Sequence, residues 1–112
     1  MSKKKLVLRE DYKKFYPLST RWMDNDMFGH INNVVYYSFF DTAVTSFLIE
    51  TGCLTLKKNP IVFYVVHTSC NYITSLSYPE EIEAGIMLNK IGKTSITYGV
   101  SVFKKGAISA AA

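Results

Sequence analysis

The pattern of hydrophobic and polar residues changes its period along the chain. From Leu18 to Trp22 apolar and polar residues alternate, so Leu18, Thr20 and Trp22 share one face of a predicted strand. A polar stretch follows over residues 24–26. The spacing of apolar residues then becomes helical, which separates a first strand from a following helix.

A long helix is predicted over residues 33–50. Tyr36, Phe40, Ala43 and Phe47 recur at intervals of three and four, the spacing of one helix face. Asn32 or Asn33 is a suitable N-cap, and Gly52 is a suitable residue to end the helix. Because Asp41 is the only charged residue between Asn33 and Ile49, we expect the helix to be covered on most sides.

The chain after Pro60 reads as a series of strands. Residues 61–76 form a largely apolar run, and residues 82–88 and 96–102 alternate between apolar and polar. Residues 89–93 contain a glycine and predict a hairpin, and residues 107–109 begin one more strand. One helix is available to cover the apolar face of such a sheet. The predicted fold is therefore α+β, an antiparallel sheet wrapped around one long central helix.

Composition narrows the class of protein. A chain of 112 residues with 48% hydrophobic residues suits one domain. No stretch has the length of a membrane span or signal peptide, and two cysteines form no disulfide framework, so we expect a cytoplasmic protein that does not contact membranes. Residues 1–14 carry the whole net charge of +4, and the rest is neutral. We interpret residues 1–14 as a basic, flexible arm and residues 15–112 as the domain, and we expect no binding to nucleic acid.

The candidate chemistry lies in residues 21–33, Arg-Trp-Met-Asp-Asn-Asp-Met-Phe-Gly-His-Ile-Asn-Asn. This segment brings carboxylates, an imidazole and two amides to the start of the helix. A helix N-terminus has unpaired N–H groups and a positive dipole end, so it can stabilise a developing oxyanion. A carboxylate beside it can act as a base or a nucleophile on a polarised carbonyl. The arrangement suits acyl transfer.

The same segment could also bind a metal ion or serve only a structural role. A calcium loop fails because Phe28 and Val35 occupy its fifth and twelfth positions. His30 and His67 have no third ligand nearby in the sequence, so no metal site is predicted. Asp24 and Asp26 remain open to a purely structural role in turns and caps.

The residues Arg21-Trp-x-Asp24-x-Asp26-x-x-Gly-His-Ile-Asn-Asn33-x-x-Tyr36 resemble the signature of the hot-dog-fold acyl-CoA thioesterases of the 4-hydroxybenzoyl-CoA thioesterase family. A looser similarity continues through the helix, residues 77–80 and the hairpin at residues 91–95. The resemblance implies a hot-dog fold and the hydrolysis of an acyl-CoA thioester to a carboxylic acid and coenzyme A, without a cofactor.

The resemblance also implies roles for individual residues. Asp26 is the catalytic carboxylate, acting as general base or nucleophile, and backbone N–H groups from Gly29 to Asn33 hold the carbonyl oxygen. His30, Asn32 and Asn33 fix the loop and orient Asp26, and His30 is also a candidate for a direct place in the site. The predicted substrate-binding residues are Asn32, Tyr36, Asp41, Lys90 and Lys93, the two lysines meeting the phosphates of coenzyme A.

The family forms homodimers or homotetramers with active sites between subunits, so residues 67–72 are candidates to complete a neighbour's site. Two features depart from the family: Val44 stands where many members have arginine, and the last strand is expected to be incomplete where the sequence stops at Ala112. Two alternatives remain, a non-catalytic module that binds acyl-CoA or an acyl-carrier protein, and a hot-dog hydratase or dehydratase.

Overall fold

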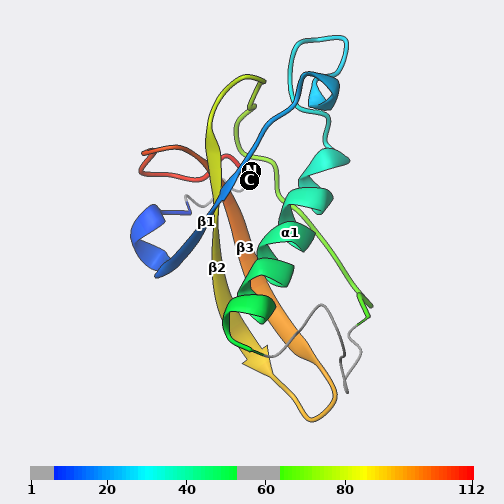
Figure 1. The fold of residues 1–112 in the computed structure, drawn as a ribbon, viewed down its shortest axis with the longest axis vertical. Helices are drawn as coiled ribbons and strands as arrows, with labels where there is room; N and C mark the ends of the chain where they lie inside the picture. The colour runs from blue at the N-terminus through cyan, green and yellow to red at the C-terminus, as the bar shows by residue number, and fades with distance from the viewer. Residues whose placement is uncertain (1–6, 53–63) are drawn as a thin grey trace, which may run out of the picture.

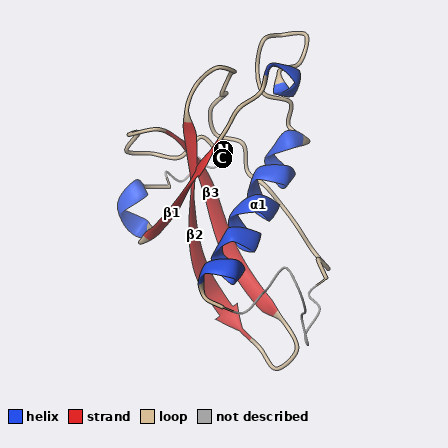
Figure 2. Ribbon diagram, viewed as in Figure 1, coloured by secondary structure: helices blue, strands red, loops and turns tan. Residues whose placement is uncertain are grey.

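One long helix lies across a face of a three-stranded antiparallel sheet in the computed structural model (Figures 1 and 2), which describes residues 7–52 and 64–112. Along the chain the elements are the 3₁₀ helix η1 (Arg9–Asp11), strand β1 (Lys14–Leu18), the 3₁₀ helix η2 (Trp22–Asp24), helix α1 (Val35–Glu50), strand β2 (Ile82–Ile91) and strand β3 (Ile96–Lys104). The predicted α+β class and the central helix are confirmed. In the described ranges, no helix has both the length and the apolar character needed to cross a membrane.

The sheet has the order β1-β2-β3, with β2 in the centre. Leu18 pairs with Ile82, which pairs in turn with Lys104. A register shift near the hairpin, between Leu88 and Lys90, marks an irregularity in the β2–β3 ladder. Strand β1 contains Pro17, which cannot donate a ladder hydrogen bond and is tolerated because β1 has one neighbour in this sheet.

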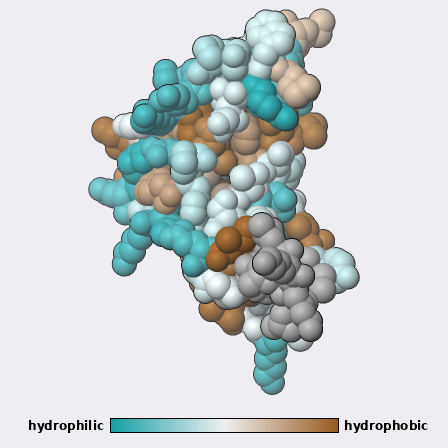
Figure 3. All heavy atoms as spheres, in the orientation of Figure 1, coloured by the Kyte–Doolittle hydropathy of each residue, from teal (hydrophilic) through white to brown (hydrophobic). Residues whose placement is uncertain are grey.

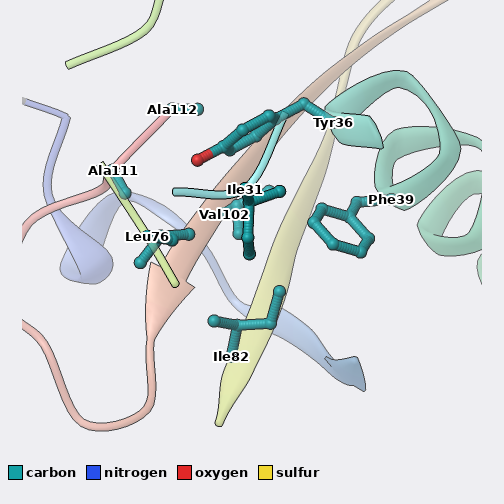
Figure 4. Close-up of a cluster of buried hydrophobic side chains, with 8 residues drawn as sticks. All are labelled: Ile31, Tyr36, Phe39, Leu76, Ile82, Val102, Ala111 and Ala112. Carbon is teal, nitrogen blue, oxygen red and sulfur yellow. The ribbon is translucent and has the colours of Figure 1, made fainter. Parts of the chain in front are cut away.

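The core lies between α1 and the sheet. Helix α1 buries Tyr36, Phe39, Ala43 and Leu48, which recur at intervals of three to five. Figure 4 shows the part of this core nearest the start of α1, with the Tyr36 hydroxyl directed toward the side of the cluster formed by the C-terminal residues. The cluster comprises Ile31, Tyr36, Phe39, Leu76, Ile82, Val102, Ala111 and Ala112.

The opposite side of α1 is open within this chain. Ser38, Asp41 and Thr42 are exposed, so the expectation of a helix covered on most sides is not met by the described residues. On this side the Thr42 hydroxyl forms its hydrogen bond within the helix, because it donates to the Ser38 carbonyl at 2.9 Å.

Residues 7–14 belong to the folded domain, which corrects the boundary predicted for the basic arm. The Arg9 guanidinium forms an ion pair with Glu83 and lies 4.8 Å from the centre of the Phe15 ring and 5.0 Å from that of Phe103. Its Nε donates to the Ala107 carbonyl at 2.6 Å. A cation between two aromatic faces and a carboxylate is a packing element, so counting charge alone misassigned it. Residues 1–6 lie outside the described residues.

Two predicted strands are placed differently in the structure. The first strand is β1, which ends at Leu18, and Trp22 lies in η2 with 75% of its surface exposed. Residues 64–76, the described part of the run predicted at 61–76, form no strand. Their backbone meets two other segments at single points instead: Ile31 N–H donates to Leu76, and Ile73 N–H donates to Ala111. Without a continuous neighbour no ladder forms.

The C-terminal residues extend the sheet by a short contact. Ala111 N–H donates to the Val102 carbonyl at 2.8 Å, and Val102 N–H donates to the Ala112 carbonyl at 3.0 Å. Ser109, in the predicted extra strand, forms an isolated bridge with Leu8. These contacts place residues 110–112 between β3 and the segment around Ile73.

Two glycines in the sheet provide a matched test of packing. A Cβ atom on Gly85 would lie 2.9 Å from Tyr12 Cγ and 3.0 Å from the Phe15 ring, both in a packed aromatic cluster. A Cβ on Gly99 would meet the side chains of Asn89 and Met87, which have room to move. We expect Gly85→Ala to lower the free energy of unfolding by about 1–3 kcal/mol and Gly99→Ala to cost clearly less. Urea denaturation of both variants measures the difference; equal costs contradict it.

Candidate active site

The site loop, residues 24–33, is fixed at its start by the buried carboxylate of Asp24, which is 1% exposed. Its Oδ2 accepts the Arg21 N–H at 2.9 Å, and its Oδ1 accepts Arg21 Nη2 at 2.9 Å and Nε at 3.2 Å. The Asp24 carbonyl accepts the Asn32 N–H at 2.8 Å, which ties the two ends of the loop together. Asp24 is therefore saturated with donors and holds the loop in place.

Asp26 closes a tight turn in the middle of this loop. Its Oδ1 accepts the N–H of Phe28 at 2.8 Å and of His30 at 3.3 Å, and its own N–H donates to the His30 carbonyl at 2.7 Å. Gly29 at the turn has φ +79°, a left-handed conformation that favours glycine. Among the described residues, Asp26 Oδ2 accepts no hydrogen bond, so one oxygen of this half-buried carboxylate is anchored and the other is available.

The loop consumes most of its own amide donors before α1 begins. The N–H groups of Gly29, Ile31 and Asn32 donate to the carbonyls of Asp26, Leu76 and Asp24, and that of His30 donates to the Asp26 side chain. The Val34 N–H donates to Asn32 Oδ1 at 3.1 Å. From residue 28 to 37, the Asn33 N–H is the backbone donor that meets no acceptor in the described part of the chain.

Residues 72–78 hold the loop from the other side. The Ile31 N–H donates to the Leu76 carbonyl at 2.7 Å, and the Ser77 hydroxyl donates to the Gly29 carbonyl at 2.8 Å. The Tyr78 N–H donates to Asn25 Oδ1 at 3.0 Å. In Figure 1 the two segments lie at the same end of the molecule, beside the start of α1.

A surface pocket of about 440 Å³ opens where these segments meet. Asp26, Ile31, Asn33 and Tyr36 line one side, and residues 72–75 line the other. Burial raises the pKa of the Tyr36 phenol, and the nearby backbone of Leu76 offsets part of this rise. The pocket thus combines a carboxylate, an unpaired amide and several neutral hydroxyl groups.

Three of the predicted site residues come together in this pocket: Asp26, Asn33 and Tyr36. Gly29, His30 and Asn32 lie in the same loop but outside the lining, with the His30 side chain exposed and Asn32 bonded to the backbone ahead of α1.

The other three predicted residues lie elsewhere in this chain. Asp41 is on the exposed side of α1. Lys90 lies near the end of β2, and Lys93 lies in the hairpin that joins β2 to β3. This hairpin is at the end of the molecule opposite the site loop (Figure 1). A single chain therefore does not bring the two lysines to the pocket.

Sequence reasoning missed part of the far wall. Tyr72, Thr74 and Ser75 add three hydroxyl groups to the pocket of their own chain. The sequence predicts Tyr72 only within residues 67–72, as a candidate to complete the active site of a neighbouring subunit. Their one signal in the sequence is a polar interruption in the apolar run after Pro60. In the described part of the chain, no three His, Cys, Asp or Glu side chains gather as metal ligands would.

Comparisons with known proteins identify the family and the fold. The profile of the Thioesterase superfamily matches residues 28–111. The structure of the PA5185 protein from Pseudomonas aeruginosa is 43% identical, with a TM-score of 0.91, covering 96% of this chain and 75% of that one. A Xanthomonas campestris protein that carries the provisional name of acyl-CoA thioesterase is 25% identical, with a TM-score of 0.74, covering 87% and 83%.

A sequence relative, the uncharacterised protein YsmA of Bacillus subtilis, is 25% identical over 89 residues. That match covers 80% of this chain and spans 60% of the relative's length. The helix on its antiparallel sheet is a hot-dog fold, as the sequence predicted. The chain belongs to the thioesterase superfamily.

The two aspartates of the loop should differ in how much stability the same substitution costs. Asp24→Asn removes an acceptor from a buried, charge-assisted cluster, so we expect the free energy of unfolding to fall by about 1–3 kcal/mol. Asp26→Asn keeps an oxygen that can accept from Phe28, so its cost should be below about 1 kcal/mol. Chemical denaturation of the pair measures both, and a larger cost at Asp26 would contradict the assignment.

Proposed function

We propose that this protein is a thioesterase that hydrolyses an acyl-CoA to a free carboxylic acid and coenzyme A. One observation carries the proposal: Asp26, which has a carboxylate oxygen without a donor, and Asn33, whose N–H meets no acceptor among the described residues, line the same pocket. The superfamily membership supports thioester hydrolysis in general. The profile match begins two residues after Asp26, so the role of Asp26 rests on the loop geometry and the signature.

Asp26 supplies the carboxylate of the reaction. Because two amides hold its Oδ1, the carboxylate is fixed in direction, and Oδ2 is left to attack the thioester carbonyl or to take a proton from the attacking water. Both routes add oxygen to the carbonyl carbon and break the carbon–sulfur bond, and a proton from water passes to the departing thiolate. In the nucleophilic route a water molecule then hydrolyses the acyl–Asp26 anhydride, which releases the carboxylic acid and restores the carboxylate. The role of nucleophile or base is left open.

The Asn33 N–H binds the carbonyl oxygen in this proposal. The negative charge that develops there faces the first turn of α1, whose dipole favours an anion. The predicted range of donors, Gly29 to Asn33, narrows to Asn33 because the other amides already have acceptors. The hydrolysis needs no redox step, and coenzyme A is part of the substrate, so no cofactor is included. The acyl-CoA class is supported by the name of the Xanthomonas relative, and a cytoplasmic location stays a prediction.

The first test is thiol release from short, long, branched and aromatic acyl-CoA thioesters. We expect Asp26→Asn to lower kcat by about 10²–10⁴, the contribution of a positioned acid–base group, while the fold is retained. Asp11→Asn, the same change at an exposed carboxylate in η1, serves as the matched control and should keep wild-type turnover.

Near wild-type turnover in Asp26→Asn would contradict the catalytic role. Binding of acyl-CoA without turnover in the wild type would instead favour a non-catalytic binding module. Hydration of an unsaturated acyl-CoA without thiol release would favour a hydratase.

We further propose that the protein works as a homodimer or homotetramer with the sites at subunit interfaces. Tyr64, Val65 and Val66 are 82%, 75% and 90% exposed, in a segment that pairs with no strand among the described residues. Trp22 in η2 and Met27 in the site loop are 75% and 90% exposed. Figure 3 shows patches of hydrophobic residues, in brown, at the surface between hydrophilic ones. Apolar clusters of this kind are typical of surfaces that another chain covers.

Light scattering coupled to gel filtration measures the oligomeric state. We expect the wild type to have at least twice the mass of one chain, and Val66→Lys to shift the population toward the monomer because it places a charge in the apolar segment. Thr97→Lys, at an exposed position of β3, is the control and should leave the mass unchanged. A monomeric wild type would contradict the proposal.

A further inference from the structure

Tyr72 connects the far wall of the pocket to the start of α1. Its hydroxyl donates to the Asn33 carbonyl at 2.8 Å, across 39 positions of sequence. Its ring meets the Tyr36 ring edge to face, with the ring centres 5.2 Å apart. The side chain lines the pocket together with Asp26 and Asn33. The tyrosine therefore bridges the wall and the loop at the place where the proposed reaction occurs.

The bond acts on the residue that presents the unpaired amide. Within the helix, the Asn33 carbonyl accepts the Tyr36 N–H at 3.3 Å, a long bond that constrains it weakly. The Tyr72 bond is shorter and comes from outside the helix. Because the carbonyl and the N–H of Asn33 share one Cα, restraining the carbonyl limits rotation of the residue. The direction of its N–H is limited with it.

The hydroxyl of Tyr72 keeps its proton at neutral pH and so remains a donor. Its partial burial raises its pKa to about 12, and the neighbouring Cys70 and Tyr37 act in the same direction.

We propose that Tyr72 is a positioning residue of the thioesterase site: its hydroxyl holds Asn33 so that the Asn33 N–H points at the substrate carbonyl oxygen. This inference rests on the proposed function. It assigns the far wall a part in transition-state stabilisation, in addition to its part in shaping the pocket. In this proposal the ring contributes to substrate binding and the hydroxyl contributes to turnover. Tyr72→Phe separates the two contributions, because it removes the hydroxyl and keeps the ring.

The test compares Tyr72→Phe with Tyr78→Phe in the full chain. The two tyrosines are 37% and 38% exposed, and no described residue hydrogen bonds to the Tyr78 hydroxyl. Using the acyl-CoA that the wild type hydrolyses fastest, we expect Tyr72→Phe to lower kcat about 5- to 50-fold with KM within about twofold. Tyr78→Phe should keep both constants. The Kd for a non-hydrolysable thioether analogue should be the same in all three proteins.

Each other outcome overturns the inference in a recognisable way. A kcat within twofold of wild type in Tyr72→Phe shows that the hydroxyl positions nothing. A Kd that rises as much as kcat falls, or an equal loss in Tyr78→Phe, assigns the effect to pocket structure. No thiol release from the wild type removes the proposed function together with the inference. Turnover that depends on Asp26 but not on the Tyr72 hydroxyl removes the inference alone.

Discussion

The need of every backbone amide for an acceptor shapes this site. The loop between η2 and α1 satisfies nearly all of its N–H groups, partly within itself and partly through the Leu76 carbonyl, which accepts from Ile31 at 2.7 Å. The bond joins two residues of the same buried cluster, where water cannot replace it, so the loop and the far wall are held as one unit. The Asn33 amide stands out because its neighbours are already bonded.

The loop also separates two tasks that its sequence leaves mixed. Asp24 and Asp26 are two residues apart and chemically identical, yet one is 1% exposed and surrounded by Arg21 donors while the other borders a pocket. Residue spacing alone left both open to turn and cap roles, and only the family signature favoured Asp26. The structure adds a physical basis for the difference, because a buried carboxylate with donors on both oxygens is held in its ion pair, whereas Asp26 keeps one oxygen without a donor among the described residues.

The periodicity of apolar residues correctly predicted the helix and two of the strands. The spacing of Tyr36, Ala43 and neighbouring residues predicted α1, and the alternation from Ile82 onward predicted β2 and β3, because helix and strand periods follow from backbone geometry. Contacts across the sequence were harder to predict. The packing of Arg9 against Phe15 and Phe103, and the meeting of Tyr72 with Asn33, depend on the assembled fold and leave no periodic trace. Lys90 and Lys93 were expected near the pocket, yet they lie at the other end of the molecule.

The carbonyl of Ala111 has a wider consequence. It accepts from both Ile73 and Thr74, at 2.8 and 3.0 Å, while the Ala111 amide donates to Val102 of β3. Residues 110–112 therefore separate strand β3 from the far wall of the pocket, residues 72–75. A larger side chain in place of one of these alanines would change the distance between the sheet and the far wall, and with it the width of the pocket, while residues 24–33 stay unchanged.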